Sequence, residues 1–263
     1  MNEDYSFQQW NPQGTKKLIF LHGFTGSENS FQQVAENLSE DFHVIAPLLP
    51  GHGRADYKIP SYFMEDQVNW LRALIESMGL QEAAIAGYSM GGRLALGYAM
   101  RYPVESLIVV SSSPGIEDEA ERLLRAQADR KLADDIRTRG LDWFVSYWES
   151  IPLFKSQQAL PDSVKQTVRN ERLQHDAHHL AQSLEQFSTG NMPSYWSRLN
   201  SYTNPVTLIV GELDTKFVSI GQKMKMRLEN VELIEVPAVG HAIQVENPKM
   251  FATIIEDVLL RRQ

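Results

Sequence analysis

A serine between glycines, in Ala86-Gly-Tyr-Ser-Met-Gly-Gly-Arg93, is the feature of this sequence that most constrains its fold. It follows an apolar run directly and precedes a stretch with helical spacing, which is the context of a nucleophile elbow. A serine at such a strand-to-helix turn adopts a strained backbone, and the glycines two residues before and after it leave room for the reversal. The pattern alone is weak evidence of function, because glycine-rich turns also occur without one. Its value depends on whether the chain supplies a base, an acid and an oxyanion site in the right order.

Apolar runs alternate with helical patterns along the first 113 residues. Runs at 17–21, 42–48, 83–86 and 107–111 predict buried strands, and apolar spacing predicts helices over 31–38, 64–78 and 90–100. The alternation resumes with strands at 206–211 and 231–236 and helices near 220–228 and over 248–260. Apolar strands separated by helices indicate a mostly parallel sheet covered on both faces, a doubly wound α/β fold.

The alternation stops between about residues 114 and 203. This stretch is rich in charged residues, Gln, Trp and Leu, and its spacing predicts helices over 119–136, 141–148, 163–173 and 178–187. We therefore expect a core of residues 1–113 and 204–263, interrupted by an inserted helical cap of residues 114–203.

Composition excludes several classes of function. The first ten residues are polar and acidic, and no apolar run approaches the roughly 20 residues that span a bilayer, so we expect a cytoplasmic protein without a membrane partner. The net charge of −8 argues against nonspecific nucleic-acid binding. The absence of cysteine excludes disulfides, thiolate metal sites and a cysteine nucleophile. Because the protein is acidic overall, an anionic ligand would need positively charged side chains close to its binding site.

The base and the acid occur in the order that the elbow requires. Asp214 follows the run at 206–211, and His241 follows the run at 231–236. Serine, then acid, then histidine, each after a strand of the sheet, is the order of an α/β-hydrolase triad. His241 would take the proton of Ser89, and Asp214 would hold the imidazole in the correct tautomer. Alone, such an Asp would be a turn former and such a His a surface residue, but together with the serine they favour the triad.

The oxyanion site has its own signature after the first apolar run. The α/β-hydrolase fold takes one backbone N–H donor of its oxyanion site from the loop after this run, here His22-Gly-Phe24. The backbone N–H groups of Phe24 and Met90 are therefore the expected pair of donors. We expect structural roles for His22 and His52, with the imidazole of His22 hydrogen-bonded beneath this loop.

A group of histidines in the cap is not expected to bind a metal. His175, His178 and His179 lack an accompanying acidic motif of the HExxH type. A solvated helix face is the better interpretation, and we expect neither a metal nor a cofactor.

Five short segments are spread along the whole chain: HGFTGS at 22–27, PGHG at 50–53, GYSMGGR at 87–93, GELDTKF at 211–217 and GH at 240–241. With them the chain resembles the 2-succinyl-6-hydroxy-2,4-cyclohexadiene-1-carboxylate (SHCHC) synthases, α/β-hydrolase-fold enzymes of menaquinone biosynthesis. The first and last of these segments are common to the whole superfamily. More specific are GYSMGGR, the segment WESIPLF at 148–154 and the helix ERLLRAQAD at 121–129.

The resemblance implies a lyase that releases pyruvate from a cyclohexene bearing several carboxylates, a small anionic substrate. Ser89, activated by His241 and Asp214, would act as a general base that removes a ring proton. The oxyanion amides would hold the charge that develops on the neighbouring succinyl carbonyl, and the enolpyruvyl group would then leave.

The same resemblance assigns substrate-binding residues. Arg93, Arg125 and Arg172 match arginines that bind carboxylates in the family, Trp148 matches a pocket-lining aromatic residue, and Tyr88 beside the serine is expected to touch substrate. The family often has tyrosine after its cap tryptophan, where this chain has Glu149, with Tyr147 before the tryptophan instead. This departure weakens any role for a cap tyrosine.

Two other classes of function remain open at this point. A carboxylesterase or C–C bond hydrolase would use the same triad, and a catalytically silent binding protein would keep only the fold. A neutral ester needs no arginine at the pocket, although Arg125 and Arg172 lie in charged helices where surface ion pairs are the ordinary outcome. Arg93 is more telling, since most hydrolases of this fold need only a small or apolar residue there.

Overall fold

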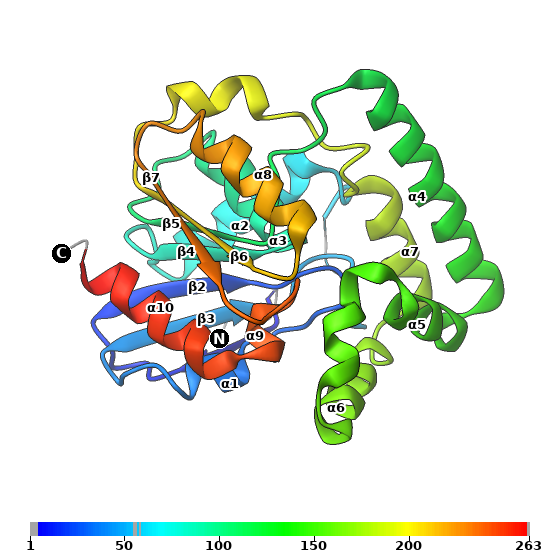
Figure 1. Cartoon of the computed structure of the whole chain (residues 1–263), viewed down its shortest axis with the longest axis horizontal. Coiled ribbons are helices and arrows are strands. Elements are labelled where there is room, and N and C mark those ends of the chain that lie inside the picture. Colours follow the sequence, from blue (N-terminus) through cyan, green and yellow to red (C-terminus); the bar gives the residue numbers. More distant parts are fainter. Residues whose placement is uncertain (1–4, 55–56, 58, 262–263) are drawn as a thin grey trace.

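A seven-stranded sheet forms the centre of the computed structural model, which describes residues 5–54, 57 and 59–261 (Figure 1). The strand order is β1-β3-β2-β4-β5-β6-β7, and all neighbours are parallel except β1, which runs antiparallel to β3. The strands are β1 (Phe7–Trp10), β2 (Lys16–Leu21), β3 (Phe42–Pro47), β4 (Ala84–Tyr88), β5 (Leu107–Val110), β6 (Val206–Gly211) and β7 (Val231–Val236). The predicted α/β class with a mostly parallel sheet is confirmed.

Helices cover both faces of the sheet. On one face lie α1 (Gln32–Ala35), α9 (Ile243–Glu246) and α10 (Pro248–Leu260), and on the other α2 (Met64–Ser77), α3 (Met90–Ala99) and α8 (Thr215–Lys225). Alternate residues of β2 serve the two cores, because Leu18 and Phe20 pack under α10 while Ile19 and Leu21 pack under α2 and α3. Apolar side chains on both faces therefore make the strand a continuous apolar run.

Strand β1 has no counterpart in the prediction from sequence. Its residues are only half-buried and place two exposed glutamines between Phe7 and Trp10, so the segment shows no strand-like alternation. It pairs at the edge of the sheet, with Phe7 opposite Pro47. Residues 1–4 of the polar N-terminal segment lie outside the described residues.

Two predicted helices differ most from the structure in their bounds, and the others differ by up to three residues at an end. Helix α1 is a single turn over Gln32–Ala35 rather than a helix over 31–38. Helix α8 begins at Thr215, five residues before the predicted start, because the side chain of Asp214 accepts a hydrogen bond from the backbone N–H of Phe217 and caps the first turn.

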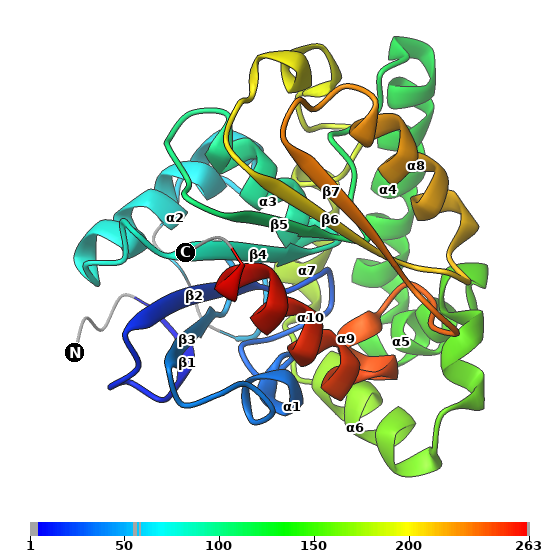
Figure 2. The same ribbon diagram turned by 60° about the vertical axis from the view of Figure 1, so that its left-hand side comes forward.

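Four helices lie to one side of the sheet, beyond the edge where its parallel strands end (Figures 1 and 2). They are α4 (Glu119–Arg139), α5 (Leu141–Ser150), α6 (Asp162–Arg172) and α7 (Ala177–Gln186). The 3-10 helix η1 (Pro152–Ala159) joins α5 to α6, and a second one, η2 (Trp196–Ser201), lies between α7 and β6. Helices α4, α5 and α7 share an apolar cluster of their own, which includes Ile136, Phe144 and Leu180. The exact domain limits at residues 114 and 203 stay a prediction.

Within the described residues, no helix combines the length and the apolar character needed to cross a membrane.

Glycines of the elbow allow β4 and α3 to pack directly on neighbouring backbone. A Cβ built on Gly91 would lie 2.1 Å from the carbonyl oxygen of Leu21, whereas one on Gly221 in α8 would meet only the ends of the Leu233 and Val210 side chains, at 3.0 and 3.5 Å. We expect Gly91→Ala to lower the free energy of unfolding by at least about 3 kcal/mol, because the backbone of β2 cannot move away. Gly221→Ala should be close to neutral, since alanine favours the helix. Chemical denaturation of both variants would measure this difference, and equal stabilities would contradict it.

Candidate active site

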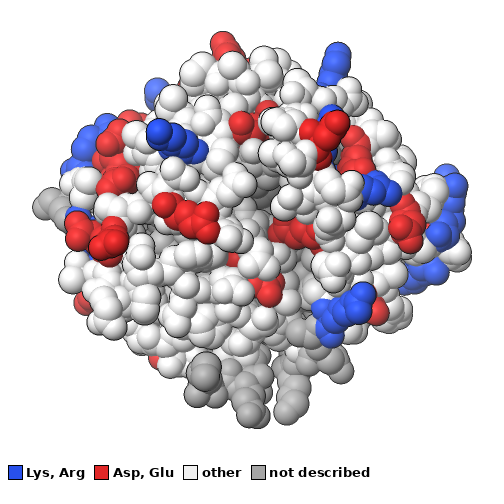
Figure 3. Space-filling model, turned by 90° about the horizontal axis from the view of Figure 1, so that it is seen from below, with Lys and Arg blue, Asp and Glu red and all other residues white. Residues whose placement is uncertain are grey.

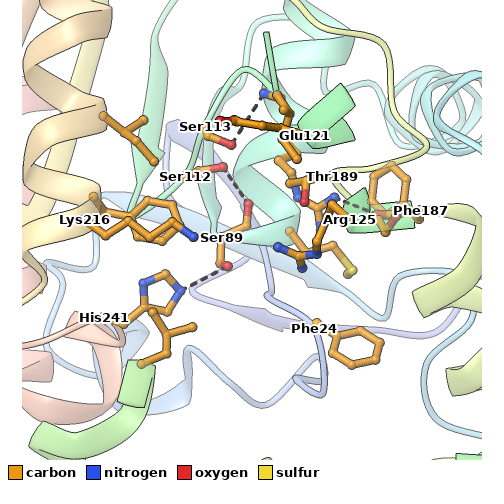
Figure 4. A pocket seen from close by; sticks show the side chains of 18 of the residues that line it. Phe24, Ser89, Ser112, Ser113, Glu121, Arg125, Phe187, Thr189, Lys216 and His241 are labelled. Carbon is orange, nitrogen blue, oxygen red and sulfur yellow. Dashed lines mark hydrogen bonds between the residues drawn. The ribbon is translucent and has the colours of Figure 1, made fainter. Parts of the chain in front are cut away.

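Ser89 occupies the strained turn between β4 and α3. Its φ of +50° lies in the left-handed region that non-glycine residues rarely adopt. The turn is fixed on both sides, because the Ser89 N–H donates to the carbonyl oxygen of Val110 and the Ser89 carbonyl accepts from the hydroxyl of Ser112 (2.6 Å; Figure 4). The side chain is therefore held at the edge of the sheet where the parallel strands end.

Ser89, His241 and Asp214 form a continuous chain of hydrogen bonds. The distance from His241 Nε2 to Ser89 Oγ is 3.1 Å, and that from His241 Nδ1 to Asp214 Oδ2 is 2.6 Å (Figure 4 shows the first). Both His241 and Asp214 are buried. With Nδ1 donating to the carboxylate, Nε2 is free to accept the serine proton, so the arrangement can deprotonate Ser89.

Glu246 supports the histidine, and sequence reasoning missed it. Its carboxylate accepts from the backbone N–H of Gly240 (2.6 Å) and of Ala242 (3.4 Å), on either side of His241. It also accepts from the hydroxyl of Ser156 in η1. A single Glu in a short helix carries no signal in the sequence, so only the folded structure reveals this contact.

The two expected oxyanion donors lie next to the serine. Met90 is the first residue of α3, and Phe24 lies in the loop after β2, in the same cavity lining as Ser89. In the part of the chain that the structure describes, neither of their backbone N–H groups has a hydrogen-bond partner. Two unpaired donors beside Ser89 can stabilise negative charge on a bound oxygen atom.

A cavity of about 750 Å³ opens in front of Ser89. It lies between the edge of the sheet and the helices α4, α5 and α7. Of the residues predicted from sequence, those that line it are Phe24, Ser89, Met90, Arg93, Arg125, Trp148 and His241. Its size suits a small molecule rather than a polymer.

Arg93 brings a cation into this cavity. Its guanidinium donates to the carbonyl oxygen of Phe187 (2.6 Å) and lies 5.3 Å from the centre of that residue's ring. Burial and the nearby charge of Arg125 lower the pKa of Arg93 to about 9, so the group is still protonated at neutral pH. No described carboxylate forms an ion pair with it. A half-buried cation without a counter-ion favours an anionic ligand.

The other cations of the cavity are more exposed. Arg125 is paired with the buried Asp129 at 2.7 Å, and its own side chain is 41% exposed, so it keeps donors for a ligand. Lys216 and Lys223 on α8 also line the cavity, and sequence reasoning did not single them out. Figure 4 shows Lys216 and Arg125 on either side of Ser89. The lining includes acidic residues as well, at 117, 118 and 121.

Arg172 and Tyr88 line a different, smaller space of about 50 Å³ behind the loop that carries Phe24. Arg172 is buried, lies 3.4 Å from Glu149 and stacks on the ring of Phe154 at 5.0 Å. The ring centre of Tyr88 lies 5.3 Å from that of His241. The structure therefore does not place these two side chains in the lining of the large cavity.

One face of the molecule has a different charge distribution. The face drawn in Figure 3 is hollowed near its centre, where acidic side chains gather, while most of its Lys and Arg side chains lie toward the edges. The cations around Ser89 are therefore a local feature of an acidic protein, with a net charge of −8.

The interpretation of His175 as part of a solvated helix face is wrong. It is 4% exposed and follows α6, where it lies against His52, with ring centres 5.4 Å apart. His52 in turn lies 4.9 Å from His22, whose ring is hydrogen-bonded beneath the loop as predicted, to Leu49 N–H and Gly23 carbonyl. The spacing in the sequence could not show this burial, because it depends on loops more than a hundred residues away. No group of described residues has the arrangement of a metal site.

Comparisons with known proteins agree with this geometry. Residues 16–248 match the family model described as the alpha/beta hydrolase fold. A Bacillus subtilis (strain 168) protein provisionally named SHCHC synthase is 39% identical over 259 residues, which cover 97% of this chain and 94% of that protein. The SHCHC synthase of Enterobacter sp. (strain 638) is 30% identical over 93% of this chain and 92% of its own length. The solved structure of MenH from S. aureus has a TM-score of 0.93 and 34% identity, covering 99% of each chain.

The buried histidines predict a loss of stability in mild acid. Burial lowers the pKa of all three histidines. The pKa of His22 falls to about 3, that of His52 falls well below its usual range, and that of His175 is also lowered. Unfolded histidines bind protons below about pH 6.5 while these stay neutral, so the folded state loses stability as the pH falls below that value. At about pH 5.5, proton binding by unfolded His22 alone lowers the free energy of unfolding by about 1.2 kcal/mol relative to neutral pH.

Thermal unfolding between about pH 7 and about pH 5.5 would test this effect. We expect His52→Leu to flatten the fall of the unfolding midpoint with pH, because one buried titrating group is removed. His178→Gln, at an exposed histidine of α7, is the control and should leave the slope unchanged. A slope that His52→Leu does not alter would contradict the assignment.

Proposed function

We propose a lyase reaction for this chain, which belongs to the alpha/beta hydrolase fold family and, within it, to the SHCHC synthases. The protein is an enzyme, and we infer that it eliminates pyruvate from 2-succinyl-5-enolpyruvyl-6-hydroxy-3-cyclohexene-1-carboxylate to form SHCHC in menaquinone biosynthesis. The observation that carries the proposal is Arg93, a half-buried cation in the cavity of Ser89 with no ion-pair partner among the described residues. The expected cytoplasmic location stays a prediction.

The bond changes fix what the site must do. The substrate has one ring double bond, at C3, and the product has two, at C2 and C4. Loss of the C2 proton moves an electron pair into the C2–C3 bond, the old double bond shifts to C4–C5, and the C5–O bond breaks. The enolpyruvyl oxygen leaves with that electron pair and becomes pyruvate after protonation at carbon. No water is consumed, so the reaction is an elimination rather than a hydrolysis.

Ser89 is the proposed base for the C2 proton. His241 takes the hydroxyl proton as Ser89 Oγ accepts the ring proton, and Asp214 stabilises the imidazolium through its 2.6 Å contact with Nδ1. The succinyl carbonyl next to C2 gains negative charge as the proton leaves. The backbone N–H groups of Phe24 and Met90 are the proposed donors to that oxygen. His241 can then return its proton to the departing group.

The cations decide which carbon meets Ser89. The substrate has three carboxylates, on the ring, on the succinyl chain and on the enolpyruvyl group. Arg93 and Arg125 are the proposed partners of two of them, because a guanidinium binds carboxylate through two parallel hydrogen bonds. Trp148 would cover the ring, since it lines the same cavity. Direct contact of Arg172 and Tyr88 with substrate stays a prediction.

Pyruvate release from the enolpyruvyl cyclohexene is the experiment that tests the reaction class. We expect coupled detection of pyruvate to show turnover by the purified protein, with little cleavage of p-nitrophenyl acetate. Ser89→Ala should reduce turnover by at least about 10³-fold, because the base is lost while the cavity is kept. Ester cleavage without pyruvate release would instead favour the carboxylesterase alternative, and full turnover by Ser89→Ala would remove the serine from the mechanism.

Arg93→Ala tests whether the cavity selects an anionic substrate. Loss of a half-buried ion pair costs about 2 to 5 kcal/mol, so we expect kcat/KM for pyruvate release to fall at least about 30-fold. Arg93→Lys should recover only part of the loss, because an ammonium group cannot form the two parallel bonds.

Arg101→Ala is the matched control for this experiment. Arg101 lies just beyond the same helix, pairs weakly with Glu65 at 3.6 Å and is distant from the cavity lining. Its kinetics should be those of the unaltered protein. Unchanged kinetics in Arg93→Ala would count against carboxylate binding at this position.

A further inference from the structure

The loop that carries the Phe24 amide has a strained backbone. Thr25, the next residue, is buried and has a φ of +68°, in the left-handed region that a β-branched residue rarely adopts. Within the loop, the N–H of Gly26 donates to the carbonyl of Gly23 and closes a tight turn. Such a conformation persists only where surrounding contacts hold it. The contacts that do so come from residues 171–176.

Glu171, near the end of α6, binds the end of this loop. A single carboxylate oxygen, Oε1, accepts from the backbone N–H of Ser27 (2.9 Å), from the Ser27 hydroxyl (2.6 Å) and from the Ser30 hydroxyl. Hydrogen bonds to an ionised carboxylate are among the strongest in proteins. Three of them on one oxygen tie α6 to the residues directly after the strained turn.

His175 binds the strained residue itself. Its Nδ1 accepts from the N–H of Gly53 (2.7 Å), so the ring proton must be on Nε2, which donates to the carbonyl of Thr25 (3.0 Å). The next residue, Asp176, donates its N–H to the carbonyl of Gly53 (2.8 Å). The imidazole thus links the core loop at Thr25 to the core loop at Gly53, and it belongs to the segment between α6 and α7.

The ring of Phe24 is held by the same group of helices. It lies edge-on to Trp148 and Phe144 of α5, with ring centres 5.5 and 6.0 Å away. The backbone on its C-terminal side is held by His175. Glu171 and His175 do not line the cavity in front of Ser89 but a separate cavity of about 810 Å³, so neither can touch the reacting atoms at Ser89.

We propose that Glu171 and His175 are positioning residues, which hold the Phe24 amide where it can donate to the developing oxyanion. The docking of α6 on the core therefore completes the oxyanion site. The effect on pyruvate release rests on the proposed function, whereas the placement of the amide does not. A purely structural role would stabilise the fold without affecting the chemical step.

Two amide substitutions of His175 separate its two hydrogen bonds. Glutamine reaches the position of Nε2 with an N–H donor for Thr25, whereas asparagine reaches that of Nδ1 with an acceptor for Gly53. We expect His175→Asn to lower kcat by about 10- to 100-fold with KM within about twofold, because the Thr25 contact is lost. His175→Gln should stay within about threefold of the unaltered kcat.

Glu171 variants test the second contact. Glu171→Ala should lower kcat by a similar factor, and Glu171→Gln, which keeps a neutral acceptor, should lower it less. Glu185→Ala is the control, because it removes ion pairs with Arg130 and Arg137 on the same side of the molecule and leaves residues 171–176 intact. All assays are run well below the measured unfolding midpoint of each variant.

Covalent labelling of Ser89 gives a readout that does not depend on the elimination. In the reaction with a fluorophosphonate, Ser89 Oγ forms a bond to phosphorus, fluoride leaves, His241 takes the hydroxyl proton, and the phosphoryl oxygen accepts from the oxyanion amides. The rate, followed by intact-protein mass, should fall in His175→Asn and Glu171→Ala by factors similar to those for kcat. It should be nearly unchanged in His175→Gln and Glu185→Ala.

The outcomes separate the two proposals. Slower labelling by His175→Asn and Glu171→Ala supports the positioning role even if the protein releases no pyruvate, in which case the proposed function alone fails. Slower labelling with unchanged pyruvate release keeps the positioning role and removes the oxyanion amides from the elimination. Labelling at the unaltered rate in both variants, with only a lower unfolding midpoint or a higher KM, overturns the positioning role.

Discussion

The strained turn at Ser89 is the constraint on which the rest of the structure depends. A φ of +50° at a non-glycine residue is held by backbone contacts with β5 and by the close approach of Gly91 to β2. These contacts require a parallel sheet whose central strands end at one edge. The same edge then receives the loops after β2, β6 and β7, which bring the Phe24 amide, Asp214 and His241 to the serine. The chemistry of the site thus follows from the topology that the turn demands.

The helices over the cavity also hold parts of the candidate site, rather than only covering it. Ser156 of η1 donates to Glu246, whose carboxylate binds the backbone on both sides of His241. Glu171 binds the end of the loop that carries Phe24. The contacts of Ser156 with Glu246 and of Glu171 with Ser27 join segments that are 90 and 144 residues apart in the sequence. A protein built this way couples the position of its covering helices to the two loops that carry His241 and Phe24.

The features predicted well from sequence are those encoded locally. Buried strands are short apolar runs, and the order of Ser89, Asp214 and His241 follows from where those runs end. Strand β1 was not predicted, because an edge strand needs few buried apolar residues and this one has no regular alternation of apolar and polar side chains. His175 is buried by contacts with residues more than 100 positions away, and Arg172 pairs with Glu149 of another helix. Glu246 lies close to His241 in the sequence, but its contact depends on how the single residues fold around the histidine. No periodicity or spacing encodes them, so only the folded chain could reveal them.

The same triad can serve a nucleophile or a base, and the surroundings decide between them. A nucleophilic serine needs a carbonyl carbon placed against Oγ, whereas a basic serine needs a C–H bond there, with the carbonyl oxygen still in reach of the same two amides. Moving a substrate by about one bond length exchanges the two arrangements. Arg93 is half-buried and forms no ion pair with a described carboxylate. It is suited to fix that offset, because burial strengthens its attraction to a substrate carboxylate. In this fold, therefore, a change of reaction class requires new anchors for the substrate and no new catalytic group.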